Sequence, residues 1–146
     1  MNPQDLISTL KAQHRSLKAE LALALSNLES GEEDKIPSNL AKFKNDLEEH
    51  LKLENVEFYP DYLNKKAKRR ESLTSTKEFI YQMEVIGKAV MSFIDKYTIP
   101  GAIDAHLLDF TDELSKITQA LNVRIETEEE GVFDIYLSMG DGNAYL

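Results

Sequence analysis

The sequence predicts an all-α fold, an antiparallel up-down-up-down four-helix bundle. Apolar residues recur every three to four positions along four long segments, and no segment shows the sustained alternation of a β-strand. The links between the segments are short: 31–37, 70–74 and 99–101. Short links make consecutive helices run antiparallel. The 146 residues fit a single domain, 1–146, in which we expect 138–146 to form a flexible tail.

The first segment, from about residue 3 to 30, carries helix signals at both ends. Asn2 suits the N-cap, Pro3 suits the first helical position, and Gly31 suits the end. The expected inner face has one polar member, His14, among apolar residues: Ile7, Leu10, His14, Leu17, Leu21, Leu25 and Leu28.

The second segment, from about 38 to 68, begins after Pro37. We expect Pro60 to kink it, because proline removes a backbone hydrogen bond inside a helix. A basic run ends the segment, where cations complement the negative end of the helix dipole. The expected inner face consists of Leu40, Phe43, Leu47, His50, Glu54 and Phe58.

The third segment runs from about 76 to 97, and Ser75 with Glu78 predicts a capping box at its start. Its inner face consists of Ile80, Met83, Gly87, Val90, Ile94 and Tyr97. The fourth segment begins between 102 and 109 and runs to about Leu137. Its inner face consists of Leu114, Ile117, Leu121, Arg124, Glu128, Val132 and Ile135.

Composition excludes several classes of function. The chain has no cysteine, so disulfides, thiolate metal sites and cysteine nucleophiles are excluded. The formal net charge of −9 disfavours binding to nucleic acid or to anionic membranes, because both are negatively charged. No secretory signal and no apolar run of about 18 residues is visible, and we expect a cytoplasmic protein.

Polar residues interrupt the apolar faces in the middle of three helices. Burying an unpaired charge is costly, so two imidazoles, two carboxylates and a guanidinium in one core must be satisfied together. A metal ion does this well, since imidazole suits iron, zinc and copper and carboxylates neutralise its charge. A structural polar network without metal is the alternative. The residues concerned are His14, His50, Glu54, Arg124 and Glu128.

At these positions the sequence resembles the hemerythrin-like, HHE cation-binding family. The segments QHRSL around His14, HLKLENVEFYP from His50 and RIETEEEGVFD from Arg124 resemble the family motifs of the first, second and fourth helices. The resemblance covers about 6 to 136 and implies a four-helix bundle that holds two irons. It implies that His14, His50, Glu54 and Glu128 match metal ligands.

The chain departs from the family pattern at the second iron. Histidines are expected where this sequence has Met83, Gly87 and Arg124, and Asp134 replaces a proline. We therefore hypothesise a site for one metal ion, in which Arg124 takes the vacated second position and grips Glu54 and Glu128. Gly87 would leave room for the guanidinium. His106 lies too far along the chain to substitute, and we expect it at the surface.

The resulting functional prediction is a non-haem metal protein, with one iron favoured over two and with manganese or zinc as alternatives. It would bind or sense oxygen, nitric oxide or iron, and as a sensor it would need a protein partner. The alternative is a metal-free interaction module. An enzyme is less expected, because no catalytic triad or phosphate loop is visible. Tyr59, Tyr62, Tyr81 and Tyr136 are treated mainly as packing residues, and the oligomeric state is left open.

Overall fold

The computed structural model describes residues 1–140. These residues are almost entirely helical and contain no β-strand. In chain order the elements are α1 (Pro3–Glu29), the 3-10 turn η1 (Glu33–Lys35), α2 (Ile36–Leu53), the π-helical turn η2 (Glu54–Phe58), α3 (Tyr59–Lys68), α4 (Thr74–Tyr97), α5 (Ala102–Ala105), α6 (Leu107–Thr127), the π-helical turn η3 (Glu128–Val132) and α7 (Phe133–Ser138).

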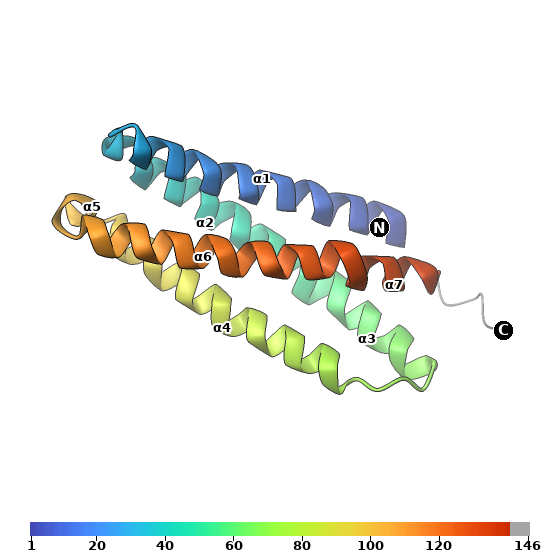
Figure 1. The fold of residues 1–146 in the computed structure, drawn as a ribbon. Helices are drawn as coiled ribbons and strands as arrows, with labels where there is room; N and C mark the ends of the chain where they lie inside the picture. The colour runs from blue at the N-terminus through green and yellow to red at the C-terminus, as the bar shows by residue number, and fades with distance from the viewer. Residues whose placement is uncertain (141–146) are drawn as a thin grey trace.

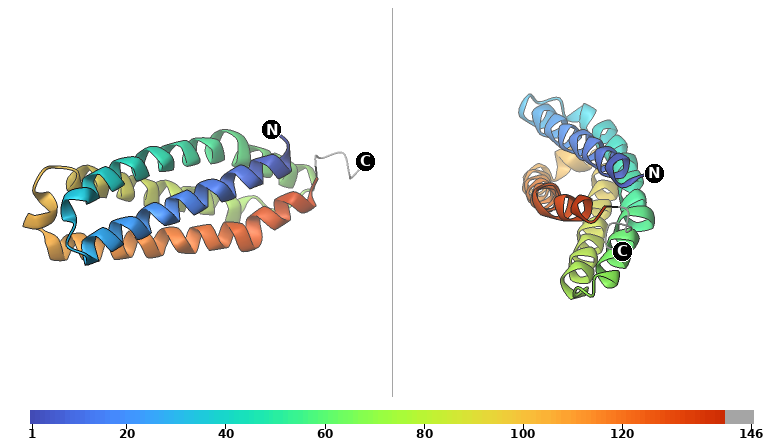
Figure 2. Two further views of the ribbon diagram at one scale, coloured as in Figure 1. Left: turned by 90° about the horizontal axis from the view of Figure 1, so that it is seen from above. Right: turned by 90° about the vertical axis from the view of Figure 1, so that its right-hand side faces the viewer.

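The long helices lie side by side along one elongated bundle, as Figures 1 and 2 show from three directions. α1 packs on α2 and α6, and α4 also packs on α2 and α6, so the four enclose a shared core. The N-terminus of α1 and the end of α7 lie at one end of the bundle, and α5 lies at the other (Figure 1). None of the helices within 1–140 is both long and apolar enough to cross a bilayer.

The ends of the helices agree with the sequence in most places. The Asn2 side chain accepts a hydrogen bond of 2.8 Å from the Asp5 backbone N–H, which confirms the predicted cap. Gly31 adopts a φ of 75°, a left-handed conformation that glycine tolerates without strain. The predicted capping box is wrong: α4 begins at Thr74, so Ser75 lies inside the helix and caps nothing.

The π-helical turn η2 stands where the sequence predicted a proline kink. Pro60 lies in the first turn of α3, directly after η2, where an absent N–H is tolerated best. The bend is thus built from a π-turn that ends before the proline, a common way for long helices to change register. The predicted basic run, which includes Lys65, Lys66 and Lys68, lies in the last turn of α3 as expected.

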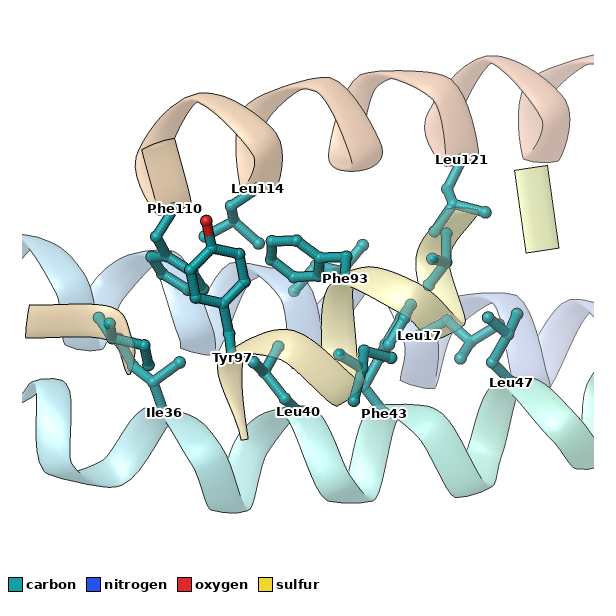
Figure 3. Close-up of a cluster of buried hydrophobic side chains, with 14 residues drawn as sticks. Leu17, Ile36, Leu40, Phe43, Leu47, Phe93, Tyr97, Phe110, Leu114 and Leu121 are labelled. Carbon is teal, nitrogen blue, oxygen red and sulfur yellow. The ribbon is translucent and has the colours of Figure 1, made fainter. Parts of the chain in front are cut away.

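Two apolar clusters fill the bundle. The distal cluster, shown in Figure 3, lies toward α5 and consists of Leu17, Leu21, Ile36, Leu40, Phe43, Leu47, Val90, Phe93, Ile94, Tyr97, Ile103, Phe110, Leu114 and Leu121. The terminal cluster lies toward the chain ends and consists of Leu6, Ile7, Leu10, Phe58, Tyr59, Tyr62, Phe133, Tyr136 and Met139. His14 and His50 occupy the helix turns between the two clusters.

Three expectations about burial and order need correction. Leu25 is 42% exposed and Ala24 is buried in its place. An α-helix has 3.6 residues per turn, so residues spaced by four positions gradually leave the buried face of a long helix. Ile135 is 47% exposed, since η3 shifts the register of the last helix. Residues 138–140 are not loose: Met139 is buried, and Lys65 Nζ donates to the Gly140 carbonyl at 2.8 Å. The rest of the predicted tail, 141–146, lies outside the described residues.

Candidate cation-binding site

Four polar side chains from four elements of the chain converge between the two apolar clusters. His14 comes from α1, His50 from α2, Glu54 from η2 and Glu128 from η3. Each is at most 4% exposed. One nitrogen or oxygen of each residue lies within 4.8 Å of the corresponding atoms of the other three. The four residues that the sequence singled out are therefore brought together in one buried place.

Local helix geometry positions the two carboxylates. His50 and Glu54 are one turn apart on the same helical rod, so their side chains project from the same face. Glu54 is the first residue of η2, and Glu128 is the first residue of η3. Each carboxylate thus stands where the helix takes in one extra residue. π-turns of this kind are frequent at functional sites.

The outer nitrogen, Nδ1, of each imidazole is held by a partner from a different helix. His14 Nδ1 lies 2.6 Å from Oε2 of Glu129, and His50 Nδ1 lies 2.7 Å from Oε1 of Gln13. Both partner atoms are hydrogen-bond acceptors, so each Nδ1 carries the proton and donates. In the neutral imidazoles, both Nε2 atoms then present lone pairs to the interior.

The inner nitrogens face carboxylate oxygens. His14 Nε2 lies 3.2 Å from Oε1 of Glu128, is buried, and has no hydrogen-bond partner. His50 Nε2 is in close contact with Oε1 of Glu54. Two lone-pair atoms repel at such distances unless a proton or a cation lies between them. The donor set, two imidazole nitrogens and two carboxylates, is one that divalent transition metals bind well.

Burial shifts the ionisation of these groups. Burial and the neighbouring His14 lower the pKa of His50 to about 4, so this imidazole is neutral near pH 7. Burial and the charge of Glu128 raise the pKa of Glu54 well above its ordinary value. Burial also favours a higher pKa for Glu128, but its close contacts with His14, Glu54 and Tyr59 outweigh burial and lower that pKa. Of the two carboxyls, Glu54 therefore holds a proton more readily.

Aromatic side chains of the terminal cluster close one side of the site. The Tyr59 hydroxyl donates a 2.5 Å hydrogen bond to Oε2 of Glu128. The Phe133 ring stacks on the His14 imidazole, with centroids 5.7 Å apart and planes inclined by 13°. Phe58 packs edge-on against Phe133 behind this pair. These rings exclude water and fix the orientation of the imidazole and the carboxylate.

A cavity of about 20 Å³ adjoins the four residues on the opposite side. That volume is enough for about one water-sized occupant. Leu17, Leu47 and Leu121, which stand together at one end of the cluster in Figure 3, line the cavity toward the distal cluster. Met83 and Arg124 line it as well. The cavity therefore lies beside Met83 and Arg124, two positions at which the family resemblance led us to expect histidines.

Arg124 does not make the contacts that we expected of it. Its Nη1 donates to Gln82 Oε1 at 3.2 Å, its Nη2 donates to the Phe79 carbonyl, and the guanidinium lies over the Phe79 ring. Among the ion pairs of residues 1–140, none joins Arg124 to Glu54 or Glu128. The guanidinium turns instead toward α4, where a backbone carbonyl and an amide oxygen supply neutral acceptors.

Gly87 also has a different neighbour from the one expected. A Cβ atom at this position would meet Leu51 Cδ1 at 3.5 Å, not the guanidinium of Arg124. Gly87 lines an open groove between α2 and α4, together with Leu51 and Met83. Its lack of a side chain therefore makes no room for Arg124. Met83 lines both this groove and the cavity.

Comparison with known proteins agrees with the geometry. The profile of one family, described as the hemerythrin HHE cation binding domain, matches residues 5–136. The chain belongs to this family. Searches of curated proteins and of solved structures found no match to this hemerythrin domain. Family membership and the buried histidine and glutamate cluster together establish a domain suited to binding a cation.

Sequence reasoning missed two residues that hold the imidazoles of this hemerythrin domain. Gln13 directly precedes His14 yet serves His50, and Glu129 directly follows Glu128 yet serves His14. The only signal in the sequence was adjacency to a candidate ligand, which does not say where a side chain points. His106 is exposed between α5 and α6, as predicted.

Proposed function

We propose that this hemerythrin domain binds one divalent cation, iron in preference to manganese or zinc, through His14, His50, Glu54 and Glu128. A bound iron(II) with an open coordination position would supply a place for a small ligand such as oxygen or nitric oxide. The protein residues would fix the position of the cation, exclude bulk water and hold the protons of the outer imidazole nitrogens. Binding or sensing of such a ligand, or of iron itself, is the role that we assign.

The observation that carries the proposal is the inward direction of both Nε2 atoms. Each imidazole is anchored through Nδ1, and His14 Nε2 is buried without a hydrogen-bond partner. A buried polar atom without a hydrogen-bond partner costs free energy of folding unless a bound ion or water satisfies it. A cation between the nitrogens and the carboxylates would satisfy all four groups at once.

Metal content tests this proposal. Protein loaded without oxygen with iron(II), manganese(II) or zinc(II) should retain about one ion per chain after removal of free metal. His50→Gln and Glu54→Gln should each lose most of that ion. His106→Gln, at an exposed histidine, is the matched control and should retain it. Retention of two ions per chain would contradict a single site.

The alternative is a metal-free bundle that acts as an interaction module. The buried Arg124, only 8% exposed, favours it, because a guanidinium near a cation repels that cation. Failure to retain any ion under any loading condition would support this alternative. With either function, we assign the antiparallel four-helix arrangement to the bundle; the cytoplasmic location, the protein partner of a sensor and the absence of catalysis stay predictions.

A further inference from the structure

The surface of α4 carries a line of residues that the core of the bundle does not use. Its members recur at alternating spacings of four and three residues, so they lie along one side of the helix. We call them the α4 stripe: Lys77, Tyr81, Glu84, Lys88, Met91 and Asp95. Met91 is half-buried and the others are exposed, with Tyr81 at 64%. α4 runs along the lower edge of the bundle in Figure 1, where no other long helix covers its outer side.

The order of residues in the α4 stripe is symmetric. Each member has a counterpart at the same distance on the other side of Ile86, and the charged counterparts have opposite signs. The counterpart pairs are Lys77 with Asp95, Tyr81 with Met91, and Glu84 with Lys88. Two such helices that lie antiparallel about a two-fold axis level with Ile86 would place every member opposite its counterpart.

Most charges of the α4 stripe have no partner within the chain. Among the ion pairs of residues 1–140, none involves Lys77, Glu84 or Lys88. Glu84 and Lys88 are one helical turn apart, a spacing that often forms an ion pair, yet their side chains do not meet. Asp95 contacts Lys44 of α2 at 3.0 Å, but its side chain is 66% exposed and can accept from a second lysine. The charges of the stripe are therefore accessible to a partner.

An open groove lies beside the α4 stripe, between α2 and α4. Four of the six stripe residues line it, and Leu51, Ile80 and Met83 give it an apolar lining. Gly87 contributes no side chain there. In the antiparallel pairing, Tyr81 of a second copy faces Met91 at the edge of this groove. Contact between a methionine sulfur and an aromatic ring adds attraction to the burial of apolar surface.

The charge balance of the α4 stripe favours a second copy over another partner. The chain has a net charge of −9, so two copies repel each other in general. The stripe has two lysines and two carboxylates, and is neutral. A parallel pairing would place each charge opposite itself, whereas the antiparallel pairing places each charge opposite its counterpart. The order of the charges thus selects both the partner and its direction.

We propose that the α4 stripe is the interface of a homodimer, in which α4 of each copy packs antiparallel on α4 of the other. The two-fold axis passes level with Ile86, and the groove between α2 and α4 receives Tyr81 of the second copy. A contact about one helix wide is at the small end of specific interfaces, so the dimer is reversible. The interface contains none of the four candidate cation ligands, and it does not depend on the cation.

Sedimentation equilibrium of the full chain at increasing concentration tests the dimer. The parent should show a monomer–dimer equilibrium. Glu84→Lys and Lys88→Glu each place like charges opposite each other and should weaken association by at least about tenfold. The double variant Glu84→Lys with Lys88→Glu restores opposite charges in the antiparallel pairing and should associate like the parent. A mixture of the two single variants should form heterodimers for the same reason.

An ion pair on α6 provides the matched control. Asp112 and Lys116 have the same spacing, are exposed and lie outside the α4 stripe. Asp112→Lys and Lys116→Glu change the net charge by the same amounts as the two stripe variants and should leave association unchanged. A parent that stays monomeric at every concentration would overturn the proposal. Single stripe variants that associate normally, or a double variant that does not recover, would also overturn it.

Cross-linking tests the register of the two helices. The chain has no cysteine, so Tyr81→Cys and Met91→Cys each introduce a single thiol. Oxidation of a mixture of these variants should give a disulfide between position 81 of one copy and position 91 of the other. Neither variant alone should cross-link, because identical positions would lie about 15 Å apart along the helix axis. Cross-links between identical positions would contradict this register. Association should be the same with and without a cation, so each proposal can fail alone.

Discussion

The hydroxyl of Tyr59 donates a hydrogen bond of 2.5 Å to Oε2 of Glu128, across the bundle from α3 to η3. This bond fixes the carboxylate that also faces His14 Nε2 at 3.2 Å. A carboxylate held in this way keeps its remaining oxygen directed at the interior. The contact thus joins the packing of the terminal cluster to the geometry of the proposed cation site.

Removal of this hydroxyl should weaken cation binding without unfolding the bundle. We expect Tyr59→Phe to lower the affinity for zinc or iron(II) by about tenfold or more, the usual effect of losing a group that orients a metal ligand. Competition with a chelator of known affinity measures it. Tyr62→Phe removes a hydroxyl from the same cluster and should leave the affinity unchanged. Equal losses in both variants would contradict a specific role for Tyr59.

The carboxylate behind His14 should also tune the site. Glu129→Gln keeps a hydrogen-bond acceptor for His14 Nδ1. It removes the negative charge that makes the imidazole Nε2 a stronger ligand for a metal ion. We expect the cation affinity to fall by about tenfold to a hundredfold. Glu130→Gln makes the same change at the next residue, which is exposed, and should have little effect. An unchanged affinity in Glu129→Gln would show that the hydrogen bond, not the charge, matters.

Cation binding should release a proton from Glu54. The pKa of this carboxyl is raised by burial and by Glu128, so the cation-free protein holds a proton there at pH values where a free carboxyl is ionised. Proton and cation compete, so the apparent affinity should rise with pH, by up to about tenfold per unit, until Glu54 is ionised in the cation-free protein. Calorimetry in buffers of different ionisation enthalpy counts the protons. An affinity that falls as pH rises would reverse the sign of this argument.

Restoring histidines should restore a second cation. Arg124→His together with Met83→His removes the guanidinium and places two imidazoles on the cavity wall, opposite the four retained residues. We expect the double variant to hold about two ions per chain. Arg124→His with Met91→His is the matched control, because Met91 lines the outer groove and not the cavity. That control should retain about one ion.

Gly87 offers a stability test that does not depend on metal. The position is helical, and an added Cβ would make an ordinary contact of 3.5 Å with Leu51. We expect Gly87→Ala to raise the free energy of unfolding by up to about 1 kcal/mol, the difference in helix propensity. Chemical denaturation of the cation-free protein measures it. A destabilised variant would mean that Leu51 cannot accommodate the methyl group.

Helical periodicity was enough to predict that four of the five polar core residues meet. His14, His50, Glu54 and Glu128 each continue an apolar stripe, and a residue in register with buried leucines is carried into the same core. The limits of the helices followed from Asn2 and Gly31 for the same local reasons. The candidate site was therefore readable because its members obey the spacing of the helices that carry them.

The direction of a side chain at the edge of an apolar helix face could not be predicted from the sequence. Arg124 has a long side chain, and its choice of Phe79 and Gln82 over the carboxylates depends on α4, a helix distant in sequence. The register after Glu128 was also missed: Phe133 and Tyr136 are buried, where a continuous α-helix would bury Val132 and Ile135. The five-residue step from Glu128 to Phe133 was the available signal.

The π-turns η2 and η3 change the register of the two helical rods that contain them. One residue added to a helix rotates everything beyond it by about 100°. In each of the two rods, the side chains after the π-turn, η2 or η3, are therefore rotated about the helix axis relative to those of an uninterrupted α-helix. Deleting a single residue of η2, such as Val56, would leave the sequences of α2 and α3 unchanged. It would nevertheless rotate Tyr59 and Tyr62 of α3 away from the residues they pack against. The proposed cation site thus lies at the π-turns, where the register of two helical rods changes.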